Sequence, residues 1–145
     1  MTLDELHQQL LAAGCNPNNY AIGNWEGMYD GICLAQFNNE WHIFYAERGQ
    51  QQQIFSTFES QDMACQAFLH IILNMEHRHL VGFFQTSDAA EALCNLLTEA
   101  GLSPIQDMIP YSSGPSPVRY RVFVVGKEIF KARETLGENI QVSTT

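Results

Sequence analysis

The side chains best able to bind a metal ion gather in Glu76-His77-Arg78-His79, where two imidazoles stand two positions apart beside a carboxylate. A structural zinc site takes four ligands at characteristic spacings, and no cysteine lies near this segment in the sequence. Basic side chains at the end of a helix are also stabilised by the helix dipole. We therefore expect no metal ion and no other cofactor in this protein.

Nucleophilic and acid–base catalysis have no recognisable signature in the chain. The four cysteines are widely spaced and form neither a CxxC pair nor a dense disulfide framework: Cys15, Cys33, Cys65 and Cys94. No GxSxG, HExxH, glycine-rich phosphate loop or calcium loop occurs. Acids are plentiful enough that a catalytic carboxylate pair stays open as an alternative. We expect a protein that is not an enzyme.

The N-terminal residues and the cysteines indicate the cellular compartment of the protein. Met1-Thr2-Leu3-Asp4-Glu5 lacks the basic start and apolar stretch of a signal peptide, and no apolar run approaches the ~18 residues that span a bilayer. Scattered cysteines in helical, Ala- and Leu-rich surroundings are typical of buried, reduced thiols. We expect a cytoplasmic protein.

Two arginines, Arg119 and Arg121, alternate with apolar residues near the end of the chain. In a strand they point the same way, about 6.5 Å apart. One interpretation is a clamp for a phosphate or carboxylate ligand. The other, which we favour, is pairing with Asp or Glu on a neighbouring strand.

Net charge indicates the class of partner. Seven basic residues stand against sixteen acidic ones, a net charge of −9, and residues 1–118 hold two basic residues against thirteen acidic ones. The last 27 residues instead hold five basic residues against three acidic ones. Such a field repels nucleic acid and anionic membranes and speeds association with basic proteins. We expect a basic protein partner, and neither a nucleic acid nor a membrane.

Aromatic and acidic residues alternate in the loop 23–31, which contains Trp25, Glu26, Tyr29 and Asp30. Trp and Tyr are enriched among the residues that carry most of the binding energy at interfaces. The alternative is a loop that folds its aromatic rings back to close the edge of the core. Together with a second long loop region, this loop provides our candidate binding residues: Trp25, Glu26, Tyr29, Asp30, Asp107 and Tyr111.

Hydrophobic periodicity and turn residues place the elements. Asn38-Asn39 has the residues of a two-residue hairpin turn, and the four glutamines 50–53 suggest an exposed turn that leads into a strand. We expect helices over 2–13, 60–76, 87–100 and about 127–135, and strands over 20–22, 32–37, 41–48, 52–58 and 118–125.

Element order and composition predict one small α+β domain over residues 1–145. A length of 145 residues with 46% hydrophobic content suits a single core. We expect one antiparallel sheet, a meander plus a C-terminal hairpin, packed against the two main helices, with Phe68 and Leu93 buried. The tail from about 138 to 145 should be frayed.

The stretch 41–49, Trp-His-Ile-Phe-Tyr-Ala-Glu-Arg-Gly, is followed by Phe58-Glu59-Ser60, then by Ala64-Cys65 with Phe68, and later by 120–126, Tyr-Arg-Val-Phe-Val-Val-Gly. This pattern resembles bacterial immunity proteins of polymorphic-toxin systems, including contact-dependent growth inhibition. The resemblance implies a protein that binds and blocks a cognate toxin domain, commonly a nuclease. It implies no catalytic residues.

An acidic protein that caps a basic nuclease cleft would also explain the charge, because complementary fields accelerate and orient binding. The alternative is a secretion chaperone, which would be small, acidic and cytoplasmic too, and would bind an extended client segment. A chaperone would form a dimer with apolar grooves. We expect a monomer that forms a 1:1 complex with a toxin.

Overall fold

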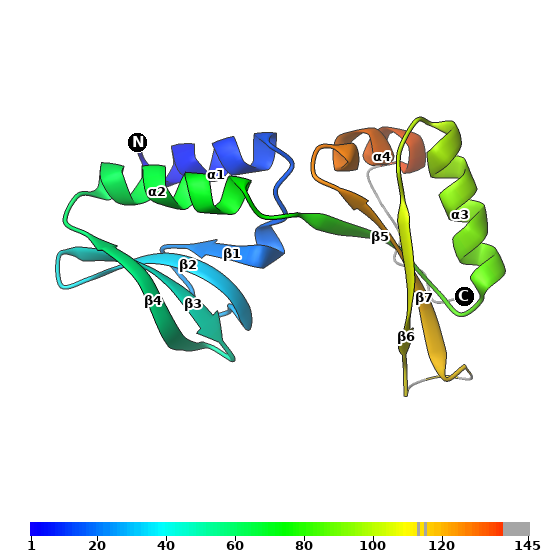
Figure 1. Ribbon diagram of the computed structural model, residues 1–145, viewed down its shortest axis with the longest axis horizontal. Helices are drawn as coiled ribbons and strands as arrows, with labels where there is room; N and C mark the ends of the chain where they lie inside the picture. Colours follow the sequence, from blue (N-terminus) through cyan, green and yellow to red (C-terminus); the bar gives the residue numbers. More distant parts are fainter. Residues whose placement is uncertain (113, 115, 138–145) are drawn as a thin grey trace. The chain divides into compact units, whose positions relative to one another are not determined.

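A computed structural model describes residues 1–112, 114 and 116–137, and it has the expected α+β class (Figure 1). The chain forms two compact units, Met1–His77 and Arg78–Thr145. Each unit has its own sheet, with helices on one face, and its own hydrophobic core. The expected tail at 138–145 lies outside the described residues.

Unit 1 holds a four-stranded sheet in the order β1-β2-β3-β4. Asn38 and Asn39 both have positive φ, as a two-residue hairpin between β2 and β3 requires, and Arg48-Gly49 make an equivalent turn between β3 and β4. Its elements in chain order are α1 (Leu3–Ala12), η1 (Pro17–Asn19), β1 (Tyr20–Ile22), β2 (Asp30–Phe37), β3 (Glu40–Glu47), β4 (Gln50–Phe58) and α2 (Gln61–Leu73).

The two helices of unit 1 cover the same face of its sheet (Figure 1). Leu6, Leu10 and Phe68 are fully buried there against Leu34 and Ile43 of β2 and β3. Phe68 is thus buried as expected. The opposite face of the sheet carries a second, smaller apolar cluster around Cys33 and Phe44, with no helix over it.

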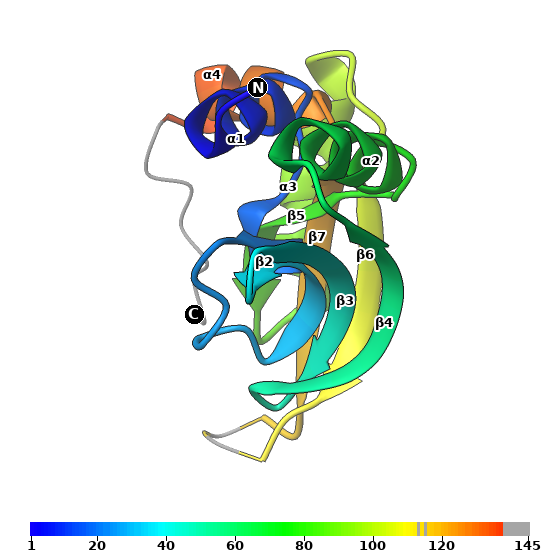
Figure 2. The ribbon, with the colours of Figure 1, turned by 90° about the vertical axis from the view of Figure 1, so that its left-hand side faces the viewer.

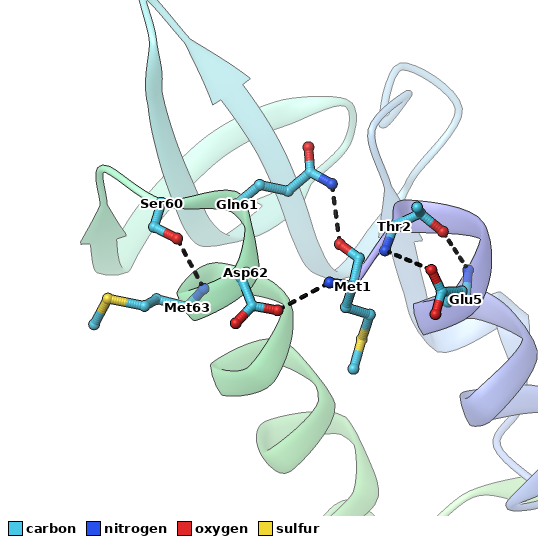
Figure 3. A network of polar contacts seen from close by, with 7 residues as sticks. All are labelled: Met1, Thr2, Glu5, Ser60, Gln61, Asp62 and Met63. Carbon is cyan, nitrogen blue, oxygen red and sulfur yellow. Dashed lines mark hydrogen bonds and ion pairs between the residues drawn. The ribbon is translucent and has the colours of Figure 1, made fainter.

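Both helices of unit 1 begin at side-chain caps that lie close to each other (Figure 3). Thr2 and Glu5 form a capping box, and the Ser60 hydroxyl accepts a hydrogen bond from the Met63 amide. The Met1 ammonium lies 2.9 Å from Asp62 Oδ1, and this contact raises the pKa of the amine. These bonds join the start of α1 to the start of α2.

Unit 2 holds a three-stranded antiparallel sheet in the order β5-β7-β6, with α3 and α4 on one face (Figure 1). Val122 and Val124 of β7 are fully buried with Ala90 and Leu97 of α3, whereas Leu93 is only partly buried beside them. Its elements are β5 (Arg78–Phe84), α3 (Ser87–Glu99), β6 (Ile105–Pro110), β7 (Val118–Val125) and α4 (Glu128–Leu136).

The arrangement of strands differs from the expected single antiparallel sheet. Residues 78–84 form strand β5, where the sequence analysis placed no element, and β5 pairs with β7 to make the second sheet. The first sheet is mixed, because β1 pairs with β2 in parallel. The glutamines 50–53 lie inside β4 rather than in a turn. That the whole chain behaves as one domain stays a prediction, although its apolar residues form separate cores.

Candidate partner-binding surface

The loop between β1 and β2 is held beside the turn between β3 and β4. The Arg48 amide donates to the Tyr29 carbonyl, and the Gly49 amide donates to the Met28 carbonyl at 3.2 Å. A side chain at Gly31 would place its Cβ 2.7 Å from both the Asn19 carbonyl oxygen and the Met28 sulfur. The loop is therefore a fixed part of unit 1 at this end of its sheet.

Trp25 packs back onto the sheet, as the alternative interpretation of the loop requires. Its ring meets Phe44 edge to face at 5.0 Å between centroids and lies 6.4 Å from Phe37. Trp25 and Met28 cover the small apolar cluster on the helix-free face. The Trp25 side chain thus stabilises the fold and is only partly available to a partner.

Tyr29, Glu26 and Asp30 have the opposite placement. The Tyr29 side chain is 68% exposed although it is large and aromatic, and Glu26 and Asp30 are both exposed. Next to them, a hollow of about 340 Å³ is lined by Glu47, Arg48, Gln50 and Gln52. An exposed aromatic ring beside acidic groups and a hollow is a suitable docking point for a protein side chain.

Asp30 and Glu47 are direct cross-strand partners in the pairing of β2 with β3. Side chains at such positions stand on the same face, about 4.5–5.5 Å apart at Cβ, and like charges there are destabilising. Within the described part of the chain, neither carboxylate has an ion-pair partner. Glu47 was not among the expected site residues, because the strand was expected to begin at 32, whereas β2 begins at Asp30 and brings Asp30 opposite Glu47.

Asp107 lies in unit 2, where it is tied to Arg121. Arg121 Nε donates to Oδ1 at 2.8 Å and its Nη2 donates to Oδ2 at 2.6 Å. This two-point ion pair lowers the pKa of Asp107 and raises that of Arg121. The favoured interpretation of Arg121, pairing with an acid on a neighbouring strand, is confirmed. Asp107 is therefore engaged within its own sheet.

Tyr111 is engaged in the same way. Its ring meets Phe83 edge to face at 5.5 Å, and the Arg119 guanidinium lies 4.1 Å from its centroid. Arg119 is 2% exposed and donates to the carbonyls of Ser116 and Val118. Of the six candidate residues, the structure brings Trp25, Glu26, Tyr29 and Asp30 together in unit 1, and places Asp107 and Tyr111 in unit 2.

His77, from the segment considered for metal binding, has a structural role. It is 4% exposed, its Nε2 lies 2.8 Å from the Ile72 carbonyl, and its Nδ1 lies 3.0 Å from the Asn16 amide. Since an amide can only donate, Nδ1 accepts and Nε2 carries the proton. Both ring nitrogens are used. No group of three metal-binding side chains occurs among the described residues.

Groups that could act as nucleophiles have unfavourable surroundings. Burial raises the pKa of the Cys33 thiol to about 11 and also raises the pKa of Cys15, Cys65 and Cys94. The Tyr20 hydroxyl lies 3.4 Å from His7 Nδ1, beside a hollow of about 260 Å³. Burial nevertheless raises the pKa of Tyr20 to about 12. These groups stay protonated near neutral pH, and a thiolate is the nucleophilic form of cysteine.

Charge is distributed very unevenly between the two units. Met1–His77 carries one basic residue, Arg48, against nine acidic residues, a net charge of −8. All nine acidic side chains are exposed. Arg78–Thr145 carries six basic residues against seven acidic ones, a net charge of −1. The field that would attract a basic partner therefore originates almost entirely in unit 1.

No family model, curated protein or solved structure matches this chain. Among the described residues, no helix combines the length and the apolar character needed to cross a bilayer.

Proposed function

We propose that this chain is a cytoplasmic immunity protein that binds and neutralises a cognate toxin domain, a basic nuclease. The observation that carries the proposal is the end of the unit 1 sheet where Asp30 faces Glu47 beside the exposed Tyr29. We call the group Glu26, Tyr29, Asp30 and Glu47 the acidic end. The proposal also agrees with the sequence resemblance to immunity proteins.

Asp30 and Glu47 carry like charges at directly opposed positions of β2 and β3. Opposed like charges cost stability in the free protein, and natural proteins tolerate such costs mainly where function needs them. A Lys or Arg from a partner would neutralise both carboxylates at once. Binding then gains the new ion pairs and also relieves the repulsion, so a basic partner is favoured over a neutral one.

A nuclease is the basic partner that best fits this surface. An enzyme that binds phosphates has a positively charged cleft, and an acidic protein that occupies the cleft blocks it without any chemistry of its own. This agrees with the expectation that the chain is not an enzyme and uses no cofactor. Tyr29 would supply an aromatic contact at the centre of the interface, with the carboxylates around it.

A secretion chaperone is the second candidate. The observation in its favour is the exposure of two adjacent apolar side chains on β4, Ile54 at 48% and Phe55 at 44%, because such a chaperone holds a client on apolar surface. Oligomeric state separates the two functions. An immunity protein would be a monomer that forms a 1:1 complex, and a chaperone would be a stable dimer without its client.

The decisive experiment combines the purified chain with the toxin domain encoded by the neighbouring reading frame. Binding is measured by calorimetry and stoichiometry by light scattering, while nuclease activity and survival of toxin-expressing cells report neutralisation. We expect a 1:1 complex, loss of nuclease activity and protection of the cells. A stable dimer that holds the toxin without inhibiting it would instead support the chaperone.

A further inference from the structure

β4 is an edge strand of unusual length and composition. It spans nine residues, Gln50–Phe58, without a single charged side chain. It pairs with β3 on one side only, and no hydrogen bond in the described part of the chain uses its other side. Natural proteins usually protect such edges with short strands, charges or proline, because an open edge accepts another strand.

The other sheet edges of the protein do carry such protection. β1 is three residues long, so it offers little edge. β6 carries a charge at Asp107 and ends in Pro110. β5 begins with Arg78 and has a register shift between Leu80 and Gly82. β4 is the one edge among these that is both long and uncharged.

β4 is also curved (Figure 2), and it presents apolar side chains to solvent. Its register against β3 shifts twice, so that Gln52 and Phe55 are extra residues with no partner in β3. Such bulges bend a strand and redirect its side chains. Phe55 and its neighbour Ile54 are both exposed. A partner strand must follow this curve, which makes the edge selective.

Carboxylates stand at both ends of β4. Glu47 lies just before it, on the other side of the Arg48-Gly49 turn, and Glu59 follows it directly. Glu40 precedes Trp41, which pairs with Phe58, so Glu40 lies beside the same end as Glu59. An extended segment along β4 would meet uncharged side chains at its centre and carboxylates at its ends.

A second copy of the chain is a poor occupant of this edge. In an antiparallel pairing centred on Ile54, Glu59 of one copy would stand opposite Gly49 of the other. Glu59 of the first copy would then lie near Glu47 and Asp30 of the second copy, where Arg48 is the one basic residue in the turn. Like charges gathered in this way are destabilising.

We propose that β4 binds an extended segment of the toxin by strand addition, and that this segment has an uncharged centre and Lys or Arg at its ends. The inference rests on the proposed function and adds the mode of recognition to it. Main-chain hydrogen bonds supply affinity in strand addition, and alternate side chains supply specificity. The segment would reach the acidic end of unit 1 through the β3–β4 turn.

Amide hydrogen exchange on the full chain tests the mode of binding directly. Amides on the open edge of β4 exchange freely in the unbound protein, because alternate residues of an edge strand have no partner. When the toxin domain encoded by the neighbouring reading frame is present, we expect alternate amides in Gln50–Phe58 to exchange more slowly by a factor of about ten or more. Protection that arises with increasing protein concentration alone would show a dimer edge and overturn the proposal.

Charge substitutions on β4 provide the second readout. Gln53→Lys places a cation at the centre of β4, between the two basic ends of the proposed segment, and a lysine on an edge strand also disfavours strand addition, so the dissociation constant should rise about tenfold or more. Gln53→Glu adds the opposite charge and should not weaken binding by this amount. Gln66→Lys, on the exposed face of α2, is the matched control for overall charge and should change the dissociation constant less than about threefold.

The possible failures are distinguishable. If the wild-type chain binds and inhibits the toxin while β4 amides stay unprotected and Gln53→Lys behaves like Gln66→Lys, strand addition is wrong and the immunity function stands. If the wild-type chain does not bind the toxin, both proposals are wrong. Slowed exchange, together with a larger loss of affinity in Gln53→Lys than in Gln53→Glu or Gln66→Lys, supports strand addition.

Discussion

Asp30 and Glu47 face each other across β2 and β3 at an exposed end of the sheet, and neither has a basic partner within the described residues. The remaining exposed acids of unit 1 increase the negative potential at this point. A free protein with this arrangement is less stable than it would be with a neutral pair, and a bound cation would remove the deficit.

Neutralising one member of this pair should raise the stability of the free protein and at the same time weaken its association with the toxin. Glu47→Gln removes the repulsion and should raise the free energy of unfolding by about 0.5 kcal/mol, while toxin association becomes slower and less sensitive to salt. Urea unfolding and stopped-flow association measure the two effects. Glu91→Gln on exposed α3 of unit 2 is the matched control and should change neither quantity. Loss of stability in Glu47→Gln would contradict this account of the pair.

The two aromatic residues of the 23–31 loop should have opposite effects. Tyr29→Ala should leave stability nearly unchanged, since the ring is 68% exposed, and should weaken toxin binding by about 2 kcal/mol through faster dissociation. Trp25→Ala removes a ring that packs on Phe44 and should destabilise the fold by about 2 kcal/mol. Denaturation measures the stability of both variants, and surface plasmon resonance measures their affinity for the toxin. Equal losses of affinity at unchanged stability would mean that Trp25 is an interface anchor after all.

The Asp107–Arg121 pair should make unit 2 sensitive to acid. Its hydrogen bonds hold the folded pKa of Asp107 below its ordinary value of about 3.9, so the pair contributes stability above that pH and loses it as pH falls through the folded pKa. Both side chains are about one third exposed, which limits the contribution to about 1 kcal/mol. Asp107→Asn should therefore be destabilised at pH 7, and the difference from wild type should shrink as the pH falls through the lowered pKa of Asp107. A constant difference from pH 7 to pH 2 would contradict the pairing.

Buried thiols should make the protein sensitive to alkali. The folded pKa of Cys33 is about 11, above the value of about 8.5 in an unfolded chain. Its contribution is fully present below pH 8.5 and is lost as pH rises through 11, because the unfolded state releases its proton first. The urea concentration at the unfolding midpoint should decrease as the pH is raised from 9 to 11. This decrease should be smaller in Cys33→Ala. Thiol-specific reagents should label Cys33 slowly at neutral pH unless urea is present.

Local signals allowed the sequence to predict most elements correctly. The helices expected over 2–13, 60–76 and 87–100 are present, and they begin at the hydroxyl caps Thr2, Ser60 and Thr86, because a helix start depends on a few neighbouring residues. The Asn38-Asn39 hairpin turn follows from the same kind of local chemistry. These features need no knowledge of the rest of the chain.

Errors arose where pairing at long range decides the structure. The glutamines 50–53 show no alternation of apolar and polar residues that would mark a strand, yet pairing with β3 places them in β4. β5 begins inside the segment 76–79, which was considered for metal binding rather than as the start of a strand. Because this strand was not predicted, the second sheet was not predicted either. Glu47 became a site residue only through its register with Asp30. This register follows from the two-residue Asn38-Asn39 turn, because the pairing runs unbroken from Phe37 with Glu40 to Asp30 with Glu47. It was missed because the strand was expected to begin only at residue 32.

Titration of the chain against the toxin domain encoded next to it, at low and at high salt, tests the central claim most directly. The account predicts a 1:1 complex with inhibition of the toxin, and an association rate that falls steeply with salt. In the double variant Asp30→Asn with Glu47→Gln, the rate should fall and lose much of its salt dependence. Absence of binding by the wild-type chain would contradict the account, and so would a double variant that binds and inhibits like wild type at both salt concentrations.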